Sequence, residues 1–86
     1  MKVNIPTPLR SYTGQARVIE ASGQSIGEVL AEIDRRFAGF RFRIIDEQDQ
    51  VRAHIKIFVN EDLVKDLRAA IGPRDTVHII CALSGG

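Results

Sequence analysis

Alternating apolar and polar residues predict two strands in the second half of the chain. Residues 51–59 separate into an apolar side and a mixed side, with Ile55, Ile57 and Val59 opposite His54, Lys56 and Phe58. Residues 76–83 separate in the same way, with Val77, Ile79, Cys81 and Leu83 opposite Thr76, His78, Ile80 and Ala82. A two-residue period is typical of strands that bury one face.

The start of the chain predicts a hairpin. Residues 2–9 begin with the same alternation, but Pro6 and Pro8 cannot donate to a ladder and favour an edge or an irregular end. A turn is expected at residues 11–14, followed by a second strand at residues 15–21.

A helix is predicted over residues 25–38. Ser25 and Glu28 form an S-x-x-E capping box, in which each side chain satisfies a free backbone N–H at the helix start. One apolar stripe then follows at helical spacing, made of Ile26, Val29, Leu30, Ile33 and Phe37. Gly39 supplies the stop.

The remaining segments are less regular. Residues 40–45, FRFRII, fit either a short strand or an irregular, turn-rich segment, and residues 46–50 are a polar loop. Turns are expected at residues 60–62 and 72–75, with a short helix at residues 65–71. One main helix packed on one sheet is a two-layer α+β domain.

Length and charge narrow the class of protein. The 86 residues fit a single domain, and the 44% hydrophobic content is ordinary for a globular protein. A formal net charge of +1 gives no general attraction to nucleic acid or to an anionic membrane, so neither is expected as a partner. The sequence has neither a signal-peptide pattern nor an apolar run long enough to span a bilayer, and it has one cysteine. These features indicate a cytoplasmic protein.

The reactive side chains do not form an enzyme site. Cys81 and His78 are three residues apart on one predicted strand, so they project to opposite faces, and Cys81 is expected in the core. His54 and His78 lack the further ligands that a metal site needs. We therefore expect neither catalysis nor a bound metal.

Two surface features suggest binding. The first is the run of arginine and phenylalanine over residues 35–43, which could stack nucleic-acid bases, dock an acidic protein, or simply complete a helix end. The second is the pair Phe58 and Ile80, which both fall on outward strand faces and together favour a protein interface.

The chain resembles the ubiquitin-like sulfur-carrier proteins of the MoaD/ThiS type, and in particular the CysO-like subgroup. The resemblance covers almost the whole chain and rests on IPTPLR at 5–10, YTG at 12–14, the helix at 25–40, IFVNEDLV at 57–64 and RDTVHIICALSGG at 74–86. Two departures are Arg74, where glycine is common before Asp75, and Cys81-Ala82, where proline is common late in the last strand.

The resemblance implies a β-grasp fold with a mixed four- to five-stranded sheet, as one domain over residues 1–86 with a flexible Gly-Gly tail at 84–86. It also implies that a MoeB/ThiF-like adenylyltransferase of the ubiquitin-activating type uses ATP to adenylate Gly86. A sulfurtransferase or other donor then gives a thiocarboxylate, whose sulfur goes to an enzyme making molybdopterin, thiamine thiazole, cysteine or another sulfur metabolite. The carrier itself binds no cofactor.

The residues at the end of the chain suit this role. Gly85 and Gly86 have no Cβ, and Ser84 is small, so the terminus can enter a narrow active site. The candidate docking residues are Phe58, Ile80, His54, His78 and Leu83. Two alternatives stay open, namely a modifier joined to lysines through Gly86 and a non-covalent interaction domain.

Overall fold

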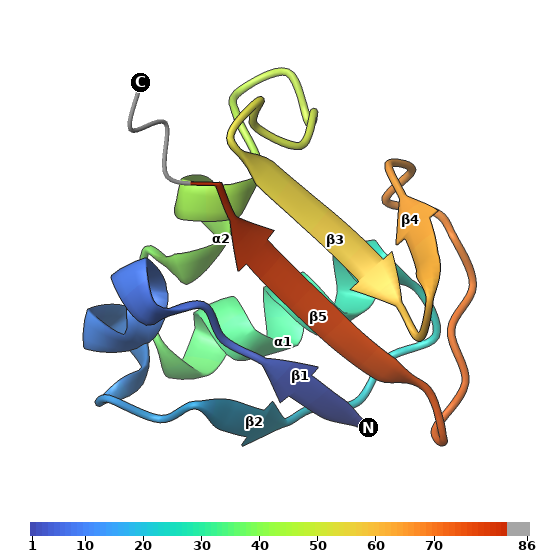
Figure 1. Ribbon diagram of the computed structural model, residues 1–86, viewed down its shortest axis with the longest axis horizontal. Helices are drawn as coiled ribbons and strands as arrows, with labels where there is room; N and C mark the ends of the chain where they lie inside the picture. The colour runs from blue at the N-terminus through green and yellow to red at the C-terminus, as the bar shows by residue number, and fades with distance from the viewer. Residues whose placement is uncertain (83–86) are drawn as a thin grey trace.

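A mixed five-stranded sheet with helices on one face makes up the protein (Figure 1). The computed structural model describes residues 1–82. Its elements, in chain order, are β1 (Lys2–Asn4), the 3₁₀-helix η1 (Thr7–Thr13), β2 (Val18–Glu20), α1 (Ile26–Arg36), α2 (Phe40–Ile44), β3 (Ile55–Val59), β4 (Asp62–Val64) and β5 (Thr76–Cys81).

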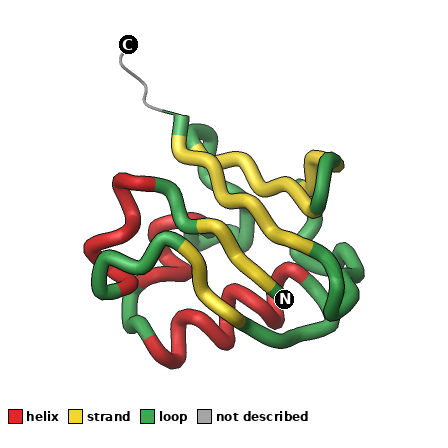
Figure 2. The backbone as a smooth tube through the Cα atoms, turned by 60° about the horizontal axis from the view of Figure 1, so that its bottom comes forward, coloured by secondary structure: helices red, strands yellow, loops and turns green. Residues whose placement is uncertain are grey.

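The strands follow the spatial order β2-β1-β5-β3-β4, so the first and last strands lie side by side at the centre (Figure 2). β1 and β5 run parallel, whereas the other three neighbouring pairs are antiparallel. The α+β fold with a mixed sheet is therefore confirmed. No helix within residues 1–82 has the length and apolar character needed to cross a membrane.

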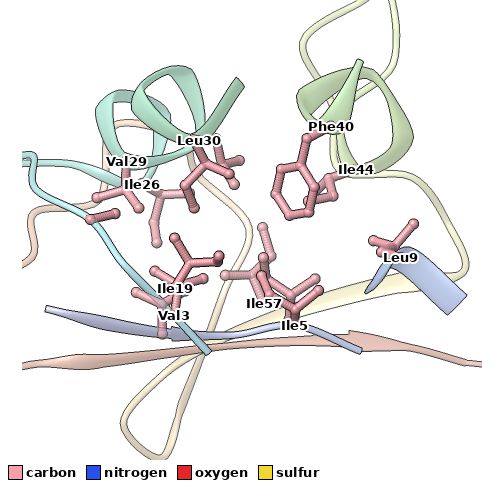
Figure 3. Packing of buried hydrophobic residues seen from close by; sticks show 14 of the residues in the cluster. Val3, Ile5, Leu9, Ile19, Ile26, Val29, Leu30, Phe40, Ile44 and Ile57 are labelled. Carbon is pink, nitrogen blue, oxygen red and sulfur yellow. The ribbon is translucent and has the colours of Figure 1, made fainter. Parts of the chain in front are cut away.

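The core lies between the sheet and the helices (Figure 3). Four of the five residues of the predicted stripe, Ile26, Val29, Leu30 and Ile33, are buried on α1, whereas Phe37 is the partly buried C-cap that ends the helix before Gly39. Phe40 and Ile44 of α2 add to the same cluster. From the sheet come the inward-facing residues Val3, Ile19, Ile55, Ile57, Val77 and Ile79. Burial of these side chains leaves the other face of the sheet to solvent.

The predicted cap of α1 by Ser25 is confirmed, while Glu28 bonds one residue earlier than a capping box requires. The Ser25 hydroxyl accepts from the Glu28 N–H at 3.2 Å, and the Glu28 carboxylate accepts from the Gln24 N–H at 3.0 Å. Each side chain satisfies a backbone donor that would otherwise lack a partner at the helix start.

The prediction of a short helix at residues 65–71 is wrong. This segment instead runs along the first turn of α1, where the Leu67 carbonyl accepts from the Gly27 N–H at 2.8 Å and the Ala69 carbonyl accepts from the Ile26 N–H at 3.2 Å. A Cβ at Gly27 would stand 3.3 Å from the Leu67 oxygen, so glycine permits this close approach. The Leu67 carbonyl, which in a helix over residues 65–71 would accept from the Ile71 N–H, accepts from the first turn of α1 instead.

Residues 40–44 form helix α2, so neither of the conformations expected for this segment is correct. Gly39 enters the helix with a left-handed backbone at φ 94°, and the Asp34 carboxylate accepts from the Arg41 N–H at 2.9 Å. Phe40 and Ile44 then lie four residues apart and are both fully buried. The capping residue belongs to α1, which a local pattern does not reveal.

Three predicted strands are longer than the observed ones. The first ends at Asn4 because the chain turns into η1 after Pro6, and the third begins at Ile55 because residues 51–54 form a bridge and a turn. The second narrows from residues 15–21 to Val18–Glu20. Beyond the ends of β1 and β2 the pairing continues only as single bonds, from the Ile5 N–H to the Arg17 carbonyl at 2.8 Å and from the Ala21 N–H to the Met1 carbonyl at 3.0 Å.

β4 was not predicted. Asn60 has a left-handed backbone at φ 56°, and β3 reverses so tightly that Val59 pairs with Asp62. The turn expected at residues 60–62 is therefore one residue shorter, and Asp62 already belongs to β4.

Candidate functional site

A continuous row of side chains crosses the solvent-facing side of the sheet. Adjacent partners in the sheet are Val18 and Asn4, Asn4 and His78, His78 and Phe58, and Phe58 and Leu63. Ile80 lies in the next row of β5, opposite Lys56. We call the set Val18, Asn4, His78, Phe58, Leu63 and Ile80 the outer face.

The outer face is more apolar than a solvated sheet requires. Ile80 is 46% exposed, and Val18 and Leu63 are each 47% exposed, while Phe58 is half-buried between them. Exposed apolar side chains on neighbouring strands form one surface, which is the arrangement expected of a protein contact. The predicted outward position of Phe58 and Ile80 is therefore confirmed.

His78 is held at the centre of this face. The Asn4 side-chain amide lies within hydrogen-bond distance of His78 Nδ1, at 2.8 Å, and this contact fixes the orientation of the imidazole ring. Cys81 packs against the core on the opposite side of the strand. The two residues therefore do not form a nucleophile and base pair.

His54 lies just before β3 and is exposed. Its carbonyl accepts from the Ala82 N–H at 2.8 Å, which extends the pairing of β3 and β5 by one residue. His54 therefore flanks the point at which the chain continues toward its carboxyl end. Leu83, Ser84, Gly85 and Gly86, which include the predicted attachment site, lie outside the described residues.

Residues 1–82 contain no group of three or more histidine, cysteine, aspartate or glutamate side chains that could hold a metal ion. The Asp75 carboxylate accepts from the Gly72 N–H and from the Asn60 side-chain amide, and these two hydrogen bonds lower the pKa of its carboxyl group. Asn60 also accepts from the Thr76 N–H at 3.0 Å. This network joins the β3–β4 turn to the start of β5 and has a structural role.

The arginine and phenylalanine run exposes only one of its phenylalanines, Phe42, which is 53% exposed and lies 4.6 Å from the Arg52 guanidinium, so it does not offer a row of stacking rings. Phe40 is fully buried, and Phe37 packs against the core. Arg36 pairs with Glu32 at 3.2 Å, and Arg41 pairs with Asp49 at 3.3 Å. Most of the run therefore stabilises the fold.

Three residues of the outer face, Asn4, Val18 and Leu63, were not among the docking residues predicted from the sequence. Leu63 was missed together with β4, although apolar residues on both sides of a two-residue turn are a signal for a hairpin. Val18 lies in a predicted strand, but its place next to Asn4 depends on the register of β1 and β2.

Comparison with known proteins gives one consistent family. Residues 3–86 match the model of the ThiS family. The sulfur carrier protein CysO of Mycobacterium tuberculosis is 34% identical over 89 residues, which cover 98% of this chain and 96% of the relative.

Solved structures agree in shape. A chain in the crystal structure of the Amycolatopsis orientalis BexX/CysO complex superposes with a TM-score of 0.92 and 33% identity, covering 99% of this chain and 98% of that one. The SAMP1 protein of Haloferax volcanii superposes with a TM-score of 0.78 at 19% identity, covering 100% and 98%. The latter likeness bears on the fold alone and agrees with the expected ubiquitin-like β-grasp.

Proposed function

Because this chain belongs to the ThiS family and is a CysO-like sulfur carrier protein rather than an enzyme, we propose that it carries sulfur as a thiocarboxylate on Gly86. Carriers of this family are activated by adenylation. The proposal adds the atom that is activated, the enzyme that activates it and the surface that this enzyme recognises.

The proposed chemistry has two steps. A ubiquitin-activating-type adenylyltransferase, similar to MoeB or ThiF, joins the Gly86 carboxylate to the α-phosphate of ATP and releases pyrophosphate. A sulfur nucleophile, supplied by a sulfurtransferase or another donor, then attacks the acyl carbon and displaces AMP. Activation is needed because a carboxylate is a poor electrophile, whereas a mixed anhydride with AMP is a good one. The protein supplies the carried group and its partners supply the catalysis.

The observation that carries the proposal is the position of β5 in the sheet. β5 pairs with β1 on one side and β3 on the other, and the Ala82 N–H is bonded to His54. Four residues separate Ala82 from the terminal carboxylate, and four residues span at most about 14 Å. An enzyme that binds Gly86 must therefore bring its surface close to the end of β5.

Phe58, Ile80 and His78 are proposed to dock the activating enzyme, with His54 and Leu83 at the border of the contact. Phe58 and Ile80 supply apolar area, and the ring of His78 between them is fixed by Asn4. Ile80 is exposed and Phe58 and His78 are half-buried in the free protein, so a partner can bury the area that they still expose.

The final acceptor is proposed to be a sulfur-incorporating biosynthetic enzyme. A relative, the Amycolatopsis orientalis CysO, is found in a complex with BexX, so a carrier of this shape is known in an assembly with a second protein. Because activation consumes ATP, we expect the carrier to act in the cytoplasm.

Intact-mass spectrometry tests the proposal. The chain is incubated with its adenylyltransferase, ATP and sulfide, and the expected product has one oxygen replaced by sulfur. An unchanged mass under conditions in which the enzyme is active on another carrier would contradict it. If ligation to lysines were the main role, cell extracts would instead show larger conjugates that survive thiol reduction.

A further inference from the structure

Beside the end of β5, on the side facing β1, the sheet has an open backbone edge. β1 pairs with β5 only from Lys2 opposite Thr76 to Asn4 opposite His78. β5 continues to Cys81, so Ile79, Ile80 and Cys81 extend beyond the last partner in β1. On the other side, these same three residues remain paired with β3.

The hydrogen-bond register identifies which backbone groups are open. The Thr76 carbonyl accepts from the N–H of Asn60, the residue after β3, at 2.8 Å. The Ala82 N–H donates to the carbonyl of His54, the residue before β3, also at 2.8 Å. Because bonding direction alternates along a strand, the N–H and C=O groups of Ile79 and Cys81 point toward the β1 side. Within residues 1–82, no backbone or side-chain group donates to the Ile79 carbonyl or accepts from the Cys81 N–H beyond that edge.

Two prolines account for this opening. If β1 continued in the same parallel register, the N–H of residue 6 would donate to the Ile79 carbonyl. The next N–H of β1 to face β5 would be that of residue 8. Pro6 and Pro8 have no N–H, and the Pro6 carbonyl accepts from the Leu9 N–H at 2.9 Å as the chain turns into η1. The segment that follows β1 therefore cannot close this edge.

A groove runs along this open edge. It is bordered on one side by Asn4, Pro6 and Pro8, and on the other by Ile79, Ile80 and Cys81. Among the residues of the 1–82 range that line it, Arg10, from η1, is the one charged side chain, and none is a carboxylate. Arg10 donates from Nε to the Ile5 carbonyl at 3.1 Å, and the remaining guanidinium N–H groups have no bond to any residue in the described range.

We propose that the activating enzyme places an extended segment along Ile79–Cys81 as an additional strand, with an acidic side chain bound to Arg10. Backbone pairing supplies the affinity that an open edge offers, and the Arg10 guanidinium selects a carboxylate. The inference rests on the proposed function, since the enzyme that holds Gly86 is the protein brought within reach of this edge. The activating enzyme would then contact the carrier at two places, the outer face of the sheet and the open backbone edge of β5.

Hydrogen exchange followed by NMR tests the backbone part of this proposal. In the free carrier, the Cys81 amide should exchange faster than the amides of Ile80 and Ala82, which point to β3. With a saturating amount of the adenylyltransferase, Cys81 exchange should slow at least tenfold. A contact restricted to the outer face would leave the Cys81 amide exchanging as before.

Charge reversal tests the acidic partner segment. Arg10→Glu should weaken the complex about tenfold or more, whereas Arg10→Lys should retain most of the affinity. Arg35→Glu is the matched control because Arg35 is an exposed arginine on α1, which packs on the other face of the sheet. Thermal unfolding of each variant verifies that the fold is intact, and the exchange measurement on the unmodified chain needs no variant.

The outcomes separate this inference from the proposed function. Formation of the complex and of the thiocarboxylate without slower Cys81 exchange would overturn the inference and leave the proposed function standing. Absence of both the complex and the thiocarboxylate would overturn both. Protection of Cys81 that increases with carrier concentration, without the enzyme, would assign the edge to a second copy of the chain and also overturn the inference.

Discussion

The N–H of Ala82 donates to the carbonyl of His54 at 2.8 Å, which joins the end of β5 to the residue before β3. Within the described residues, this is the last bond between the two strands. The site of proposed chemistry is thus separated from the folded sheet by four residues, and changes in those residues should affect activation more than stability.

Deletion of Gly86, or addition of one residue after it, tests this separation. Both changes move the carboxylate relative to the docking surfaces, so ATP–pyrophosphate exchange by the activating enzyme should be lost. The thermal unfolding midpoint should stay unchanged, because the core is built from residues 3–79. A marked fall in the midpoint would contradict the account by showing that the end of the chain supports the fold.

Ile80→Asp should weaken binding of the activating enzyme about 30-fold, which corresponds to about 2 kcal/mol. The reason is that Ile80 exposes apolar area on the strand that leads to Gly86. Val18→Asp is the matched control, since Val18 is 47% exposed and Ile80 is 46% exposed, yet Val18 lies two strands away on β2. Calorimetry measures both affinities. Equal losses in the two variants would mean that docking is not concentrated beside β5.

Ser25→Ala should lower the free energy of unfolding by about 1 kcal/mol, because it removes the acceptor for the Glu28 N–H. For a domain of this size, that loss corresponds to a fall of about 4–8 °C in the unfolding midpoint. Ser11→Ala serves as the control, since Ser11 is exposed in η1. Similar midpoints for the two variants would show that the cap contributes nothing measurable.

Stability should depend on Asp75 in a defined direction of pH. The Gly72 N–H and the Asn60 amide hold the pKa of Asp75 below its ordinary value of 3.8. A lowered folded-state pKa stabilises the protein fully above the ordinary value, and this contribution is lost as the pH falls through the folded-state pKa.

Asp75→Ala should therefore be less stable than the unmodified chain at neutral pH, and the two unfolding midpoints should converge in acid. Asp62→Ala is the control, because the exposed Asp62 side chain makes no hydrogen bond within the described residues. A difference that persists unchanged to the acid limit would show that the charge of Asp75 is not involved.

The sequence was most informative where the signal is local. The Ser25 cap and the apolar stripe of α1 lie within a dozen residues, and the outward positions of Phe58 and Ile80 follow from strand alternation alone. These features could be predicted because burial on one side of an element imposes its period on the sequence.

The failures occurred where distant residues determine the conformation. Helix α2 begins with the help of Asp34 from another helix, and the carbonyls of Leu67 and Ala69 bond to the first turn of α1 instead of forming a helix. The open edge beside Cys81 likewise depends on Pro6, which is near it only after β1 and β5 pair. Such relationships require the sheet register.

Fragment-resolved mass spectrometry of the chain purified from its native cells tests the central claim most directly. The account predicts a fraction in which sulfur replaces one oxygen in the C-terminal fragment containing Gly86, while the fragment containing Cys81 alone has its unmodified mass. Sulfur found as an addition on Cys81, with an ordinary carboxylate on Gly86, would contradict it.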